Sequence, residues 1–153
     1  MSGLMSEGYT FVMMIQGSWW GQFRQRHQQG EEVHSYVQKG AGPPKETRLI
    51  LFYVTKPVAK IAGYAEFIER KVGETDDLWN KFGPESVLNS KEKYDEFLRD
   101  YQKASFVRFK NLREAVNPIP LRDFLSLLGT KGWGRRGFYI DKGTTDKLLA
   151  LME

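Results

Sequence analysis

A basic and aromatic stretch, residues 131–139, combines the side-chain types that contact nucleic acid. Three cations, three aromatic residues and three glycines occupy its nine positions. Cations bind phosphates, aromatic rings or guanidinium planes stack on bases, and glycine lets the backbone approach a ligand closely. The alternative is a glycine-shaped loop whose rings fill the core. We favour binding roles for Arg135 and Arg136, expect Lys131 beside them, and leave Trp133 open between the two interpretations.

A second group lies in residues 18–29, which have helical spacing and end before a glycine. Trp19 and Trp20 lie about 100° apart on a helix, so one of them faces the core while the other covers a neighbour or a ligand. Trp20 and Arg24 are one turn apart and form a candidate binding pair, although a structural cation–π contact explains them equally well. We expect His27 to be packed rather than to bind a ligand.

A third group lies around the end of the most strand-like run of the chain, residues 49–55. Tyr53, Thr55 and Lys56 lie at its end, and Lys39 lies with Tyr36 on the preceding predicted strand. In a small barrel such positions line a mouth or stabilise a sheet edge, and periodicity does not choose between these roles. We include Lys39, Tyr53, Thr55 and Lys56 among the candidate nucleic-acid-binding residues.

The sequence lacks the common signals of catalysis and of metal binding. It contains no Walker-type GxxxxGK[ST], no GxSxG and no GxGxxG. His27 and His34, its two histidines, are seven residues apart with no metal-ligand pattern around them. We therefore predict no metal, no cofactor and no catalytic residue, and the sequence favours binding over a reaction.

Composition places the chain among ordinary globular proteins. It has 153 residues, of which 41% are hydrophobic and 27% charged, and it contains no cysteine. Disulfides, thiolate zinc sites and cysteine nucleophiles are therefore excluded. The apolar runs are far shorter than the roughly 20 residues of a membrane helix, and the start of the chain lacks a signal-peptide pattern. We expect a cytoplasmic protein.

Charge is unevenly distributed along the chain. The net charge is +4, with −1 in residues 1–17, +4 in residues 18–60, −4 in residues 61–102 and +5 in residues 103–153. If the fold joins the two basic parts, they form one positive face; otherwise the surface carries mixed, solvated charge.

The order of predicted elements indicates an α+β protein. We expect strands at residues 9–16, 33–39, 49–55, 59–72, 104–112 and 138–140, and helices at residues 18–29, 75–82, 90–101, 121–128 and 144–152. Ser18, Thr75 and Ser90 are candidate helix caps. A surface loop is expected at residues 40–47, and the two strands that flank Lys56-Pro57 should pair as a hairpin.

Many strands joined by short turns suggest a small, mainly antiparallel β-barrel with helices packed outside and over one mouth. We expect a single domain over residues 9–153, preceded at residues 1–8 by a start that is disordered or foreign to the natural chain.

The same succession resembles the PUA-like superfamily, in particular its ASCH and EVE domains. The resemblance rests on a Trp-containing helix ending in Gly30-Glu31-Glu32, on the following strand, and on the runs that begin at Leu49 and Ala59. It covers residues 9–141 and depends on order more than on identity. It implies a small barrel that binds RNA or modified bases in a cleft beside the barrel.

The resemblance also implies an alternative function. One ASCH branch contains amidohydrolases acting on acetylated cytidine, with a Lys and a Thr near the helix-to-strand junction and a Glu farther on. Here that junction has no lysine, so only Glu66, with Lys56 or Lys39, remains for such a role. The leading hypothesis is therefore a non-enzymatic module that binds RNA or a modified base in nucleic acid. A third possibility is a protein partner for the acidic segment 75–101.

Overall fold

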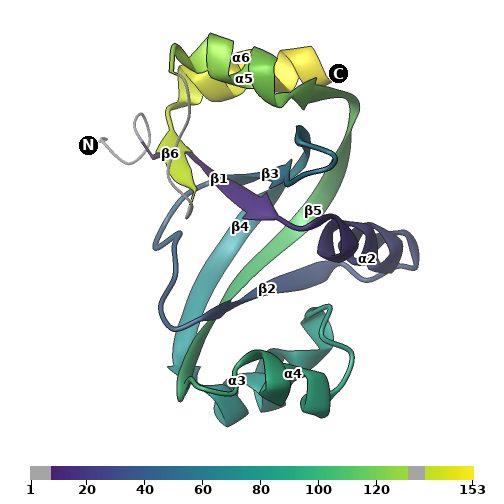
Figure 1. Cartoon of the computed structure of the whole chain (residues 1–153), viewed down its shortest axis with the longest axis vertical. Helices are drawn as coiled ribbons and strands as arrows, with labels where there is room; N and C mark the ends of the chain where they lie inside the picture. Colours follow the sequence, from purple (N-terminus) through teal and green to yellow (C-terminus); the bar gives the residue numbers. More distant parts are fainter. Residues whose placement is uncertain (1–7, 131–136) are drawn as a thin grey trace.

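A computed structural model describes residues 8–130 and 137–153, in which a six-stranded sheet is flanked by helices (Figure 1). The strands are β1 (Thr10–Ile15), β2 (Val33–Lys39), β3 (Leu49–Val54), β4 (Lys60–Glu74), β5 (Lys103–Pro120) and β6 (Phe138–Ile140). The helices are α2 (Gly17–Gln28), α3 (Thr75–Phe82), the single 3-10 turn η1 (Gly83–Glu85), α4 (Lys91–Phe97), α5 (Leu121–Leu128) and α6 (Lys142–Met152).

The sheet has the strand order β2-β5-β4-β3-β1-β6. β1 and β3 run parallel, and the other recorded pairs are antiparallel, including the expected β3–β4 hairpin. The α+β class and the mainly antiparallel sheet are thus confirmed. A closed barrel is not: in the described residues the edge strands β2 and β6 do not pair. β6 has only three residues and reaches no farther than the first half of β1, so the curled sheet stays open.

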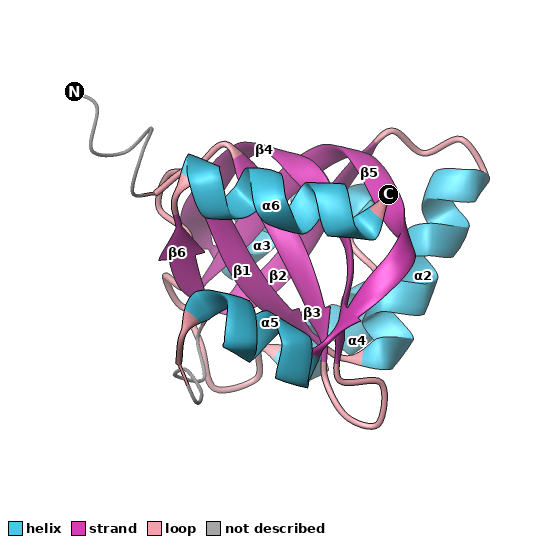
Figure 2. Cartoon of the chain, turned by 90° about the horizontal axis from the view of Figure 1, so that it is seen from above, coloured by secondary structure: helices cyan, strands magenta, loops and turns pink. Residues whose placement is uncertain are grey.

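Apolar side chains fill both faces of this sheet. On one face, Trp19, Trp20 and Phe23 of α2 pack with strand residues such as Phe52 and Phe109. On the other face, α5 and α6 cover the strands (Figure 2). The helices that the described residues form are all too short and too polar to cross a membrane.

β5 continues well past the expected end at residue 112. Pro118 and Pro120 argue against a strand because proline cannot donate to a ladder. β2, however, pairs only with residues 104–110 of β5, so the second half of β5 is bonded on one side, to β4. Proline is tolerated on such an edge. The prediction was wrong because the sequence does not reveal where the neighbouring strand ends.

The helix caps follow the predictions only in part. Ser90 caps α4, since its side chain accepts a hydrogen bond from the Lys93 amide. Ser18 and Thr75 were wrong as caps: α2 and α3 begin after Gln16 and Glu74, and neither helix has a side-chain cap. α4 ends at Phe97 instead of residue 101, which leaves Tyr101 outside the helix and free to project from the surface.

The segment from α3 to α4 packs on the sheet through an apolar cluster that includes Leu78, Tyr94 and Phe106, and an arginine adds ion pairs to this contact. Arg108 of β5 donates from Nε and Nη2 to the two carboxylate oxygens of Glu85, both at 2.9 Å, and from Nη1 to Glu69 at 2.5 Å. Its guanidinium also lies 4.6 Å from the centre of the Phe82 ring. Because an arginine paired with two carboxylates has a fixed geometry, Glu85 of η1 is held against β5, and Ser35 of β2 donates to the same carboxylate at 2.8 Å.

Candidate functional site

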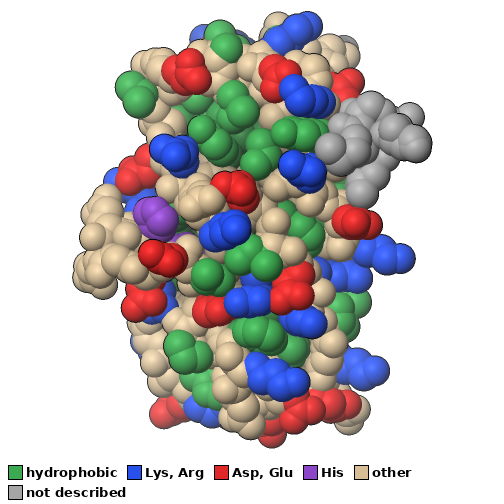
Figure 3. Space-filling view, turned by 180° about the vertical axis from the view of Figure 1, so that it is seen from behind, with side chains coloured by type: hydrophobic (Ala, Val, Ile, Leu, Met, Phe, Trp, Pro, Cys, Tyr) green, Lys and Arg blue, Asp and Glu red, His purple; other side chains and the backbone are tan. Residues whose placement is uncertain are grey.

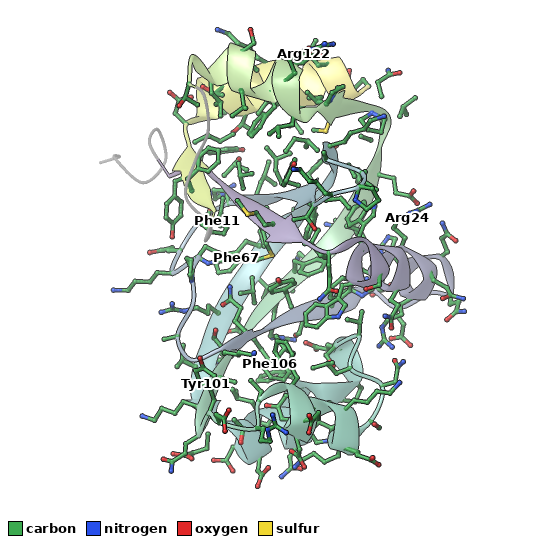
Figure 4. All side chains as sticks on the ribbon, viewed as in Figure 1. Phe11, Arg24, Phe67, Tyr101, Phe106 and Arg122 are labelled. Atoms are coloured by element: carbon green, nitrogen blue, oxygen red, sulfur yellow. The ribbon has the colours of Figure 1, made fainter. Side chains whose placement is uncertain are left out.

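A cleft of about 420 Å³ opens between β1, β2 and the end of α4. The residues that line it are Phe11, Met13, Met14, Tyr36, Val37, Gln38, Lys39, Gly42, Pro43, Phe97 and Tyr101. In Figure 4, Phe11 marks the β1 side of the cleft and Tyr101 the side of the helical segment. The cleft therefore lies at the opening that the unclosed sheet leaves between β1 and β2.

Two strand edges with free backbone groups border this opening. β6 pairs with β1 only at residues 10–12, so among the described residues Met13 and Met14 have no strand partner on that side. β2 is an edge strand that pairs only with β5. The Tyr36 hydroxyl donates to the Met14 carbonyl at 3.4 Å across the gap. Exposed backbone donors and acceptors beside an aromatic wall suit the edge of a planar, polar ring.

Aromatic rings form the wall next to β2. Trp19 lies behind the cleft, with its ring centre 5.2 Å from that of Tyr36 and 5.4 Å from that of Phe97. Burial raises the pKa of Tyr36, which keeps its hydroxyl protonated and able to donate at neutral pH. Lys39 extends over this wall, with its Nζ 5.0 Å from the Phe97 ring centre and 6.0 Å from that of Tyr101.

The loop after β2 carries further cations along the cleft. The loop is held in place because Gln38 donates to the Pro43 carbonyl at 2.5 Å and Arg70 donates to the Gly42 carbonyl at 2.9 Å. In the part of the chain that the structure describes, no carboxylate forms an ion pair with Lys39 of the cleft, with Lys45 or Arg48 of the loop, or with Arg70. Figure 3, which views the molecule from behind, shows Lys and Arg side chains interspersed with Asp and Glu over that face.

The predicted binding residues do not all gather at this cleft. Lys39 lines it. Trp20 is interior, only 7% exposed, with its ring against Phe52 and Gly63. Arg24 forms an ion pair with Glu114 at 2.8 Å, away from the cleft. The helix α2 thus supports the cleft through Trp19, the tryptophan that the sequence analysis assigned no binding role.

The candidates around the β3–β4 turn also lie elsewhere. Tyr53 is buried in the core beneath α5 and α6. Thr55 and Lys56 belong to the turn, next to the end of β1, and do not line the cleft. Lys131, Trp133, Arg135 and Arg136 lie outside the described residues.

Phe11, Met14, Phe97 and Tyr101 are cleft residues that sequence reasoning missed, and Tyr36 was noted only for its strand. Alternation in β2 does place Tyr36 and Gln38 on the face opposite Val37. Nothing in the sequence shows that β1 lies across from that face. Phe97 and Tyr101 have the spacing of apolar residues on the predicted helix 90–101. The sequence analysis therefore assigned them to that helix and not to a binding site.

The residues considered for hydrolysis are separated in the fold. The Glu66 carboxylate accepts a hydrogen bond from Asn111. Glu66 pairs with Leu49 at the start of β3, whereas Lys56 follows the end of β3, at the other end of the hairpin. Lys39 lies in the cleft, where the described lining residues include no Asp, Glu or His. An amine and a carboxylate therefore do not meet in this part of the molecule.

The two histidines, His27 on α2 and His34 on β2, lie against each other. His34 is 0% exposed and contacts the rings of Phe23 and Phe109, and its Nε2 lies 3.2 Å from Nδ1 of His27. Burial, and then the charges of His27 and Arg26, lower the pKa of His34 to about 4. Among the described residues, no group of three or more potential ligands is placed to hold a metal ion.

This buried histidine predicts acid-sensitive stability. Between pH 6.5 and 4 the unfolded chain binds a proton that folded His34 does not, so the free energy of unfolding should fall as the pH falls. The loss from this group between pH 7 and 5 is up to about 2 kcal/mol. Urea unfolding at both pH values measures it, and His34→Gln should remove that part of the dependence. An equal pH dependence in the variant would contradict the assignment.

Comparison with known proteins gives weak relationships in sequence. No protein-family model matches the chain. ATP synthase subunit alpha and large ribosomal subunit protein uL22, both from Ureaplasma parvum, are 26% and 28% identical to it over 91 residues, or 60% of the chain. The aligned part spans only 11% and 29% of those proteins.

Comparison with solved structures finds proteins that share this fold over most of their length. The ASCH protein of Zymomonas mobilis matches with a TM-score of 0.73 and 20% identity, covering 94% of this chain and 96% of that one. A mutant of that protein matches with a TM-score of 0.78 and 19% identity, over 97% and 99% of the two chains. Human THYN1, solved in complex with DNA containing 5-methylcytosine, matches with a TM-score of 0.53 and 15% identity, over 94% and 97%. The resemblance to PUA-like ASCH and EVE domains is thus confirmed at the level of the fold.

Proposed function

We propose that this chain is a non-enzymatic cytoplasmic module that binds RNA, or a modified base in nucleic acid, in the cleft between β1 and β2. The observation that carries the proposal is the meeting of two unpaired strand edges with an aromatic wall and an unpaired lysine. The strand edges offer hydrogen bonds to the edge of a base, and the rings offer a surface on which it stacks.

The charges around the cleft support a nucleic-acid ligand over a neutral small molecule. Lys39, Lys45, Arg48 and Arg70 are available for phosphates, since none of them is committed to a carboxylate in the described structure. A strand that enters the cleft would place its backbone along this border. The DNA complex of human THYN1, a protein with the same fold, is consistent with this ligand class.

The basic segment 131–136 is proposed, on its composition, to contribute to nucleic-acid binding. It is followed by Gly137, where an added methyl group would meet the Val12 carbonyl and the Phe11 ring. Phe11 lines the cleft, so the chain enters β6 beside it. We therefore retain Lys131, Trp133, Arg135 and Arg136 as proposed binding residues, and treat residues 9–153 as one binding domain.

Salt dependence tests the basic segment. Arg135→Ala combined with Arg136→Ala should weaken binding of a single-stranded RNA oligonucleotide and reduce the slope of log K against log salt by about 0.7 per lost phosphate contact. Fluorescence anisotropy at several salt concentrations measures both quantities. Arg122→Ala is the control, because that side chain is 91% exposed on α5. An unchanged slope in the double variant would remove the two arginines from the site.

A further inference from the structure

A second hollow, of about 410 Å³, lies between α2 and the segment that joins α3 to α4. Its described lining residues are Arg26, Trp79, Asn80, Gly83, Pro84, Ser86, Leu88 and Asn89. It shares no residue with the cleft between β1 and β2, so whatever it binds contacts other side chains.

The guanidinium of Arg26 is only partly satisfied in this hollow. Its Nη2 donates to the Pro84 carbonyl. Its Nε is shielded from solvent and has no acceptor among the described residues, and no carboxylate of that part of the chain forms an ion pair with Arg26. A guanidinium carries five N–H donors. Leaving such a charge partly desolvated and unpaired is costly, and an anion beside it would recover the cost.

The other groups of the hollow suit an anion with several oxygen atoms. Asn80 and Asn89 are exposed, line the hollow and carry amide N–H donors. Trp79 forms a fixed wall, packed on Tyr94 with ring centres 4.7 Å apart. Glu85 lies in sequence between the lining residues Pro84 and Ser86, and Arg108 binds both of its carboxylate oxygens. The hollow thus presents donors and no free carboxylate of its own lining.

We propose that this hollow is a phosphate-binding site, in which the Arg26 guanidinium and the amides of Asn80 and Asn89 hold the phosphate oxygens. The phosphate is free, on a small nucleotide, or part of a strand bound in the cleft. The proposal stands on Arg26 and its surroundings, and it holds whether or not the cleft binds nucleic acid.

The neighbouring histidine supplies an internal reporter. The charge of Arg26 contributes, after burial and His27, to the lowered pKa of His34. A phosphate held by Arg26 offsets that charge, so binding should raise the pKa of His34. The chain has two histidines, and their ring C–H resonances are followed by NMR without crowding.

Inorganic phosphate is the first probe. Phosphate should raise the melting temperature and shift the His34 resonances more than chloride at equal ionic strength does. Arg26→Gln should weaken the apparent affinity about tenfold or more, since it removes a charge-assisted pair. Asn80→Ala, which replaces an exposed side chain, should weaken it less without affecting folding, and Arg122→Gln on α5 should leave it unchanged. Equal effects of phosphate and chloride, or an Arg26→Gln variant that responds like the wild type, would overturn the proposal.

A single-stranded RNA oligonucleotide separates the two sources of phosphate. If a strand phosphate occupies the hollow, Arg26→Gln should lower the salt slope of RNA binding by about 0.7. If the site takes only free phosphate or a small nucleotide, Arg26→Gln should keep the salt slope of RNA binding and lose the response to inorganic phosphate. Lys39→Ala should alter RNA binding and leave the phosphate response intact, which distinguishes a failure of this site from a failure of the cleft.

Discussion

Replacing Lys39 and Tyr101 together by alanine is expected to weaken binding of single-stranded RNA by about 10- to 100-fold. Tyr101 is 47% exposed and Lys39 lies over its ring, so the double variant removes a stacking surface and a cation while the fold remains. Stacking on an aromatic side chain contributes about 1–3 kcal/mol per base, and 1.4 kcal/mol corresponds to tenfold in affinity. Because the two residues touch, their single effects should not add. Anisotropy titration of wild type, single and double variants measures this.

The chain offers a matched control for that experiment. Lys142 lies over the ring of Tyr9 with its Nζ 5.8 Å from the ring centre, and neither residue lines the cleft. Lys142→Ala with Tyr9→Ala therefore removes the same residue types from another surface. The control should keep its affinity within about twofold, roughly 0.4 kcal/mol. Equal losses in the two double variants would show that the cleft is not the site.

Gly63→Ala is expected to destabilise the fold by about 2–3 kcal/mol. Gly63 lies in β4 where its register with β5 shifts. A Cβ there would clash with the Arg113 carbonyl oxygen and would lie 2.6 Å from Cη2 of Trp20. The carbonyl belongs to the paired strand and cannot move aside, so the strands must separate or Trp20 must leave its place on Phe52. Urea unfolding gives the change in free energy.

Gly21→Ala is the control for backbone and side-chain size. Gly21 lies within α2, and a Cβ at this position would have no neighbour within 4 Å. Alanine has the higher helix propensity, so this variant should be more stable by up to about 1 kcal/mol. If Gly63→Ala were as stable as the wild type, the close packing of Trp20 on β4 would be wrong.

Local patterns predicted most of the elements, and long-range pairing accounts for the failures. The β2 strand and the helices α3 and α5 match the expected residue ranges, because alternation, helical spacing and glycine stops act over a few residues. The second half of β5 was missed because its pairing partners are far away in the sequence, as in the pairing of Pro120 with Lys60. Closure of the sheet likewise depends on pairing: the bounds of β6 were predicted, but its position at the sheet edge, paired with β1, was not.

The site was less predictable than the fold. Residue type selected Lys39, which lines the cleft, together with Trp20 and Tyr53, which are interior. The sequence does not distinguish a cation or an aromatic ring that faces a ligand from one that faces the core. What separates them here is the placement of β1 opposite β2, which brings Met14 beside Tyr36. That juxtaposition joins residues 22 positions apart through the curl of the whole sheet.

Methionine methyl NMR tests the binding cleft most directly. Met13 lines the cleft and packs in the same core as Phe11 and Trp19, whereas Met152 is buried in the core on the other face of the sheet, against which Met14 also packs. Titration of methyl-labelled protein with single-stranded RNA should shift the Met13 signal through the ring current of a bound base, while Met152 stays in place. Binding that shifts Met152 and leaves Met13 unchanged would contradict the proposed site.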